Sequence, residues 1–179
     1  MLLAFSPAER DRLIFLDGLT KSLGASNVRN AHLVAGKPVI DFIVSRSSHT
    51  VAPNFFGQAV ALAAYEIGFR KAAMPLIEPI NQSREIARQF FTEKGYRTII
   101  GDGGYYAFVD CSPAIEAGGL EDSRAFNQHL AENFGVTVIP GRDFSEFARN
   151  WVRFSYALPP EKTRKALERF DEGFRALIK

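Results

Sequence analysis

Short apolar runs alternate with longer helical patterns along the chain, and this alternation limits its possible folds most strongly. In the first part, Leu13–Leu16 and Ala31–Val34 have the length and composition of short strands, separated by a loop over Lys21–Asn30. Pro38–Ser45 and Pro53–Arg70 have helical patterns, and Pro53 suits the first turn of the second helix. These runs predict a mixed α/β protein.

The second part predicts a small sheet covered by helices, a compact α+β domain. Pro75 and Pro79 predict a break or hinge in the helical pattern, after which Ser83 would cap a helix that ends at Gly95. A turn at Gly101–Gly104 separates the first two of four strand patterns. The predicted strands are Tyr96–Ile100, Tyr105–Cys111, Val136–Ile139 and Trp151–Tyr156, and the predicted helices are Ser83–Lys94, Ser123–Phe134 and Pro160–Leu177.

Composition narrows the class of protein. The chain has 179 residues, 46% of them hydrophobic, and a formal net charge of +2, which suits one globular domain or two small ones. Its Lys and Arg residues are dispersed, so nothing predicts binding to nucleic acid or to an anionic membrane. The single cysteine, Cys111, excludes an intramolecular disulfide, and no apolar run is long enough for a membrane helix. We expect a soluble protein of the cytoplasm.

Lys21 is the first candidate for a chemical role. It follows the predicted strand Leu13–Leu16 in a run of Gly, Ser and Thr, and Arg29 stands eight residues later. Such loops at strand ends commonly present reactive groups in α/β folds, and burial of an amine favours its nucleophilic form. A solvated surface lysine is the alternative interpretation, and residue type alone favours it.

The stretch Gly18–Arg29 resembles the lysine motif of class I/II aminotransferases, which are pyridoxal-phosphate enzymes of fold type I. In that motif a lysine follows small and apolar residues, and an arginine stands eight residues after it. The resemblance implies that Lys21 forms the Schiff base with the cofactor and moves the proton between the substrate Cα and the cofactor's C4′ carbon. It also implies that Arg29 holds the cofactor phosphate. Many relatives have a serine three residues before the lysine. Gly18 occupies that place here, so Thr20 or Ser22 would supply a phosphate-binding hydroxyl.

Three later segments resemble the same family in the expected order. Gly103–Val109 is similar to its Gly-Gly-aromatic strand, Gly135–Gly141 to its Gly-Val-x-Val-x-Pro-Gly segment, and Trp151–Ala157 to its hydrophobic-Arg-hydrophobic-Ser-x-Ala strand. The resemblance implies that Arg153 binds the substrate α-carboxylate in a bidentate pair. The alternative interpretation of Arg153 is a surface cation on an edge strand.

Other polar positions have weaker support. Ser47–Asn54 resembles a loop that approaches the partner's cofactor phosphate in related dimers, although an exposed helix cap explains it equally well. We interpret His32 and His129 as ordinary strand and helix residues and Cys111 as a buried apolar residue, and we predict no metal site.

The resemblance also implies a domain organisation. Residues 1–52 would be the end of the cofactor-binding large domain and its sheet, residues 53–82 an interdomain helix and hinge, and residues 83–179 the complete small C-terminal domain. Most of a large domain would precede Lys21 in this family, whereas only 20 residues do here. The chain would then be a piece of a longer enzyme, or it would act with a separate N-terminal chain.

The implied function is transfer of an amino group from an amino acid to a 2-oxo acid with pyridoxal 5′-phosphate as cofactor. A lyase or decarboxylase of the same fold is one alternative, and a catalytically silent, dimerising module is another. We also expect the strands near Leu2–Leu19 and Ala31–Val34 to have unpaired edges, which favours a homodimer or association with a large domain.

Overall fold

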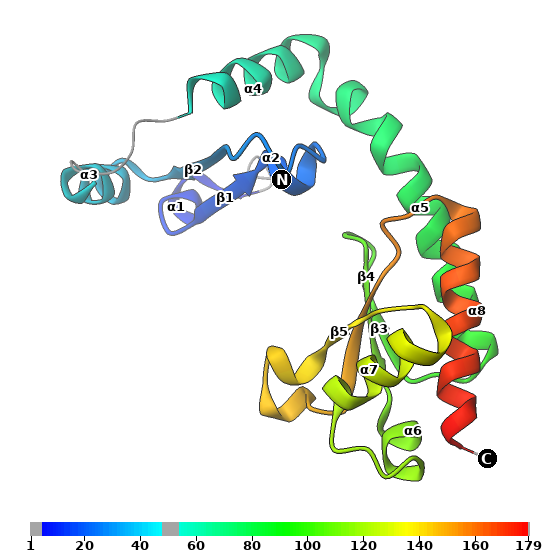
Figure 1. The fold of residues 1–179 in the computed structure, drawn as a ribbon. Helices are drawn as coiled ribbons and strands as arrows, with labels where there is room; N and C mark the ends of the chain where they lie inside the picture. Colours follow the sequence, from blue (N-terminus) through cyan, green and yellow to red (C-terminus); the bar gives the residue numbers. More distant parts are fainter. Residues whose placement is uncertain (1–4, 48–53, 179) are drawn as a thin grey trace. The chain divides into compact units, whose positions relative to one another are not determined.

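The computed structural model describes residues 5–47 and 54–178 (Figure 1). The chain divides into two compact units, Met1–Leu76 and Ile77–Lys179, which are described separately below. The boundary between them falls within one helix, α5 (Phe69–Glu93). The domain boundaries predicted at residues 52 and 82 stay predictions.

The first unit is built on a two-stranded sheet. Strand β1 (Ile14–Gly18) pairs antiparallel with β2 (Ala31–Ala35), so that Ile14 lies opposite Ala35 and Gly18 opposite Ala31. Both predicted strands are therefore present and pair with each other along one edge. The outer edge of each strand has no strand partner among the described residues, which agrees with the prediction of unpaired edges. The helices are α1 (Pro7–Arg10), α2 (Leu19–Ser22), α3 (Lys37–Arg46) and α4 (Phe55–Ile67).

Helix α5 corrects the predicted break at the two prolines, whereas the predicted kink or hinge there stays a prediction. It continues through Pro75 and Pro79, although each proline removes one backbone donor from the helix. Ser83 is not a cap: it lies inside the helix, is fully buried, and donates a hydrogen bond from Oγ to the carbonyl of Leu158 at 2.7 Å. The predicted stop at Gly95 is confirmed, since Gly95 has a φ of 75° after the helix ends.

The second unit contains a four-stranded antiparallel sheet in the order β3-β4-β6-β5 (Figure 1). The prediction of a small sheet covered by helices is confirmed. The bounds of α7 and α8 agree with the predicted helices, whereas α6 was not predicted and β5 is shorter than expected. The elements are β3 (Thr98–Ile100), β4 (Tyr106–Asp110), α6 (Ser112–Ala117), α7 (Ser123–Phe134), β5 (Ile139–Pro140), the 3-10 helices η2 (Gly141–Asp143) and η3 (Glu146–Ala148), β6 (Trp151–Ser155) and α8 (Pro160–Leu177).

One face of this sheet forms the core of the second unit. Alternate residues of β4 and β6 are buried under the helices, among them Val109 and Phe154. The ring of Phe170 on α8 lies about edge-on to that of Phe91 on α5 and to that of Phe126 on α7, with centroid distances of 5.9 and 6.0 Å. This arrangement fixes the sheet, and with it the residues on the sheet's other face.

No helix in the described part of the chain is both long and apolar enough to cross a lipid bilayer.

Candidate functional site

Lys21, Thr20 and Arg29 lie on one closed loop, residues 19–30, which we call the lysine loop. Its two ends are tied by a hydrogen bond from the amide of Leu19 to the carbonyl of Asn30 at 3.1 Å, and the amide of Ala25 donates back to the carbonyl of Leu19 at 3.0 Å. Leu19 and Val28 are buried and anchor the loop. The backbone therefore holds both cationic residues on one structured segment.

The structure places Lys21 in the single helical turn α2, directly after β1. The prediction of a lysine at a strand end is confirmed, but the predicted loop begins with a helical turn. Lys21 is exposed and Thr20 is half-buried. The Ser22 hydroxyl, the other predicted source of a phosphate-binding group, donates to the carbonyl of Gly18 at 3.1 Å. Of the two predicted hydroxyls, that of Ser22 is thus already engaged in a hydrogen bond to Gly18, the residue before the lysine loop.

Arg29 has an unusual backbone conformation. Its φ is 52°, and it is the one residue other than glycine with a positive φ among those that the structure describes. This left-handed conformation costs an L-residue with a side chain roughly 1–2 kcal/mol. The Arg29 side chain is exposed and donates from one terminal nitrogen to the carbonyl of Ser26 at 3.4 Å. Strain of this kind is concentrated at functional sites, where the position of a side chain matters more than local stability.

Helix α4 holds the lysine loop from one side through residues that the sequence analysis did not single out for this role. Asn54 caps α4 by accepting a hydrogen bond from the amide of Gly57, and it donates to the carbonyl of Val28 at 2.7 Å. Gly57 is buried against the loop, where an added Cβ would lie 2.8 Å from the Cβ of Asn30. The tight contact explains a glycine inside this helix. The segment Ser47–Asn54 was predicted to approach the partner's cofactor phosphate. Residues 48–53 of it lie outside the described part of the chain, so this stays a prediction.

Arg153 lies in β6 of the second unit, which is a central strand between β4 and β5. The alternative interpretation as a cation on an edge strand is therefore wrong. The guanidinium carbon lies 4.2 Å from the centre of the Tyr106 ring and 5.1 Å from that of Phe144. Nε of Arg153 is buried and has no hydrogen-bond partner among the described residues.

The rings of Tyr106 and Phe144 both contact the Arg153 guanidinium, and the sequence analysis missed these contacts. They come from β4 and from the segment after η2, so no local sequence pattern brings them together. Trp151 and Phe108 continue the same sheet face, with their rings stacked at 5.5 Å. Arg153 is thus positioned by packing on a half-buried aromatic surface, with its charge free of any carboxylate within the described chain.

Cys111 does not form a reactive site. It is fully buried, and burial raises the pKa of its thiol, with a smaller contribution from the Asp110 carboxylate. The neutral thiol lies 3.8 Å from the carbonyl of Val109. In the described ranges, no group of three or more His, Cys, Asp or Glu side chains is arranged to hold a metal ion.

Comparison with known proteins identifies the family. The model of aminotransferase class I and II matches residues 4–170, so the chain belongs to the class I and II aminotransferases. It is 30% identical over 173 residues to the aspartate/prephenate aminotransferase of Thermus thermophilus, covering 93% of this chain and 42% of that protein. It is 28% identical to a probable N-acetyl-LL-diaminopimelate aminotransferase of Bacillus subtilis, and the match covers 90% of this chain and 40% of that protein.

Solved structures give the same assignment of fold. An aspartate aminotransferase of Thermus thermophilus with maleate aligns with a TM-score of 0.74 at 29% identity, over 94% of this chain and 44% of that one. An aromatic aminotransferase of Pyrococcus horikoshii aligns with a TM-score of 0.81 at 24% identity, and the alignment covers 96% of this chain and 45% of that one. The chain therefore spans less than half the length of these relatives.

Proposed function

We propose that this chain carries the lysine and phosphate-binding segment and the carboxylate-binding arginine of an amino-acid aminotransferase that uses pyridoxal 5′-phosphate. The observation that carries the proposal is the lysine loop: in a member of this family, it presents an exposed amine and an exposed guanidinium eight residues apart on one hydrogen-bonded segment. The overall reaction would move an amino group from an amino acid to a 2-oxo acid.

The residues of the lysine loop fit the cofactor in chemical type. A phosphate dianion is bound well by a permanently charged guanidinium, and the exposed Arg29 offers one that makes a single contact among the described residues, to the Ser26 carbonyl. An aldehyde carbon requires an amine, which Lys21 supplies. Thr20 would add a hydroxyl near the phosphate. When bound, the cofactor supplies an electron sink that stabilises negative charge at the substrate Cα.

The remaining steps belong to side chains of this chain. Nζ of Lys21 would accept the proton from the substrate Cα as general base and then, as general acid, donate it to the C4′ carbon of the cofactor and not back to Cα, which amino-group transfer requires. Arg153 binds the substrate carboxylate, and the rings of Tyr106 and Phe144 fix the plane of its guanidinium in advance. Because the guanidinium is already oriented, less conformational entropy is lost when the substrate binds.

The relatives are longer than this chain, so the proposal includes association. A second copy, or the large domain that the family resemblance implies, would supply the rest of the cofactor site. The exposed apolar side chains of the first unit, which include Leu16 and Phe56, support such a contact. A homodimer in the cytoplasm is the form that we propose for the complete enzyme.

The proposal is tested by trapping the cofactor on the chain. The purified protein is incubated with stoichiometric pyridoxal 5′-phosphate, reduced with borohydride, and digested for peptide mapping. We expect the pyridoxyl label mainly at Lys21, and weaker labelling there in Arg29→Gln. Lys37, whose side chain is 83% exposed, serves as the control lysine.

Two outcomes would count against the proposal. Labelling of Lys37 equal to that of Lys21 would mean that the lysine loop does not select the cofactor. Labelling at Lys21 that is unchanged in Arg29→Gln would remove the phosphate-binding role from Arg29. If amino-acid substrates are then converted, product analysis separates a transaminase, which transfers the amino group to an added 2-oxo acid, from a lyase or decarboxylase, which does not.

A further inference from the structure

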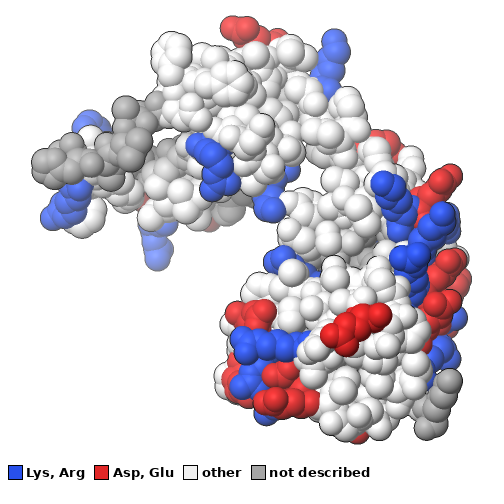
Figure 2. All heavy atoms as spheres, in the orientation of Figure 1, with Lys and Arg blue, Asp and Glu red and all other residues white. Residues whose placement is uncertain are grey.

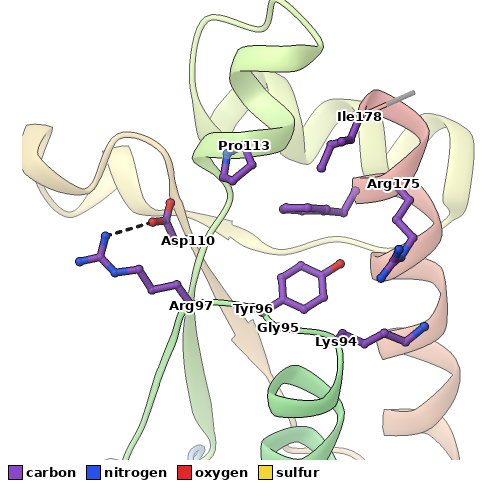
Figure 3. Close-up of a pocket in the computed structure, with 9 residues that line it drawn as sticks. Lys94, Gly95, Tyr96, Arg97, Asp110, Pro113, Arg175 and Ile178 are labelled. Atoms are coloured by element: carbon purple, nitrogen blue, oxygen red, sulfur yellow. Dashed lines mark hydrogen bonds and ion pairs between the residues drawn. The ribbon is translucent and has the colours of Figure 1, made fainter.

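The second unit contains a cavity that shares none of the residues assigned to the proposed reaction. Its volume is about 670 Å³, within the roughly 300–1,000 Å³ typical of small-molecule pockets. It opens between the C-terminal end of α5, the start of β3, the start of α6 and the end of α8 (Figure 3). All of its lining residues belong to Ile77–Lys179.

The interior of the cavity is apolar and partly aromatic. The rings of Tyr96 and Phe174 meet edge to face, with centroids 4.8 Å apart. Pro113 and Ile178 approach from α6 and from the end of α8, and both side chains point toward the same space in Figure 3. A flat apolar group would gain burial and ring contacts against this wall.

Basic side chains stand around the cavity, and their charge is only partly neutralised. Lys94 and Arg175 both contact the buried Asp171, with N–O distances of 3.1 and 2.9 Å. On the opposite side Arg97 contacts Asp110 at 3.4 Å, an ion pair drawn in Figure 3. Three cations against two carboxylates leave a local formal charge of +1.

Both carboxylate oxygens of Asp171 already accept hydrogen bonds, and its single negative charge faces two cations. Its carboxylate accepts hydrogen bonds from Lys94, from Arg175, and from the Tyr96 hydroxyl at 2.9 Å. Burial alone would raise its pKa, but these three hydrogen bonds outweigh burial and hold it below the ordinary value. Arg175 donates to Asp171 through Nε, and its terminal nitrogens donate to no other described residue, so they can bind another anion.

We propose that this cavity is a binding site for a small aromatic monocarboxylate. Its ring would lie against Tyr96 and Phe174, and its carboxylate would accept hydrogen bonds from Lys94 and Arg175. A single negative charge matches the local excess of one positive charge, whereas a cation would meet repulsion. The residues that line the site include none of Lys21, Arg29 and Arg153, so its occupancy does not depend on the proposed reaction.

Titration of the full chain with benzoate and phenylacetate tests the proposal. The single tryptophan, Trp151, is a built-in reporter, because the guanidinium carbon of Arg97 lies 5.2 Å from the centre of its ring. Isothermal calorimetry gives the stoichiometry alongside the fluorescence. We expect one saturable site for the carboxylates, at least about tenfold weaker binding of benzyl alcohol, and no binding of benzylamine, since charge-assisted hydrogen bonds are lost.

Variants locate the site. Ile178→Glu places a negative charge at the mouth of the cavity on a partly exposed residue, and we expect it to abolish carboxylate binding without unfolding the protein. Lys94→Gln should weaken binding about tenfold. Arg164→Gln, an exposed change on the same helix as Arg175, is the matched control and should leave binding unchanged. Equal affinity for benzoate and benzyl alcohol, or unaltered binding in Ile178→Glu with a native circular dichroism spectrum, would overturn the proposal.

Discussion

The two units differ in how much of their apolar surface they bury. The second unit has a continuous core in which Phe91, Phe126 and Phe170 are fully buried. In the first unit the buried apolar residues are few and separate, among them Leu19 and Val28, while large side chains on β1, α3 and α4 are exposed. Helix α4 illustrates the contrast, because twelve of its residues carry no charge and its visible surface is nearly free of charged atoms (Figure 2).

This contrast separates the two halves of the proposed chemistry. Arg153 lies on a sheet that packs against the continuous core of its own unit, whereas the lysine loop belongs to a unit with a small core. A small core leaves little free energy to offset the conformational entropy of ordering the chain. We infer that the lysine loop depends on further contacts for its full stability and that Arg153 does not.

The largest expected effect concerns the core of the second unit. Phe170→Ala removes a fully buried ring that contacts five other aromatic rings, and it should lower the free energy of unfolding by about 3–5 kcal/mol. Phe56→Ala, at a residue 67% exposed in the first unit, should change it by less than about 0.5 kcal/mol in the monomer. Urea denaturation followed by circular dichroism measures both. Similar losses in the two variants would contradict the contrast.

A second effect concerns the acid stability of the second unit. Because the pKa of Asp171 is lowered in the folded state, its contribution to stability is complete above the unfolded-state pKa, about 3.9, and is lost as the pH falls through the folded-state value. Asp171→Asn should cost roughly 1–3 kcal/mol at pH 7 and flatten this acid dependence. The measurement is the urea midpoint of Trp151 fluorescence between pH 7 and 3. Asp143→Asn, at a more exposed carboxylate, is the control.

The smallest expected effect is a gain in stability at the lysine loop. Arg29→Gly removes the cost of a positive φ and should stabilise the first unit by up to about 1 kcal/mol, offset in part by the greater freedom of glycine when unfolded. The same variant should lose phosphate-dependent labelling at Lys21. Hydrogen exchange at the amides of Leu19 and Ala25 reports the local stability. Faster exchange in the variant would show that Arg29 serves the fold and that the strain interpretation is wrong.

Local patterns predicted several elements correctly, for identifiable reasons. Helix α7 has an Asp122 cap and ends at Gly135, whose φ is 61°, and helix α8 begins at Pro160, so short-range signals mark their ends. The lysine at the end of β1 was found in the same way. In each case the signal and the structure lie within a few residues of each other.

Features that depend on distant contacts were not predicted. Helix α5 crosses Pro75 and Pro79, and the burial of Ser83 depends on a hydrogen bond to Leu158, 75 residues away. The aromatic rings around Arg153 and the contact of Gly57 with Asn30 likewise join separate segments. Sequence periodicity does not contain these pairings, because packing overrides local preference.

The contrast between the two units is tested most directly by hydrogen–deuterium exchange of the full chain at several low concentrations. The amides that join β4 to β6 should exchange slowest, and those that join β1 to β2 at least about a hundredfold faster at the lowest concentration. Protection of β1 and β2 should then rise with protein concentration or with an added large domain. Equal protection of both sheets at the lowest concentration, with no dependence on concentration, would contradict the account, because the first unit would then be stable by itself.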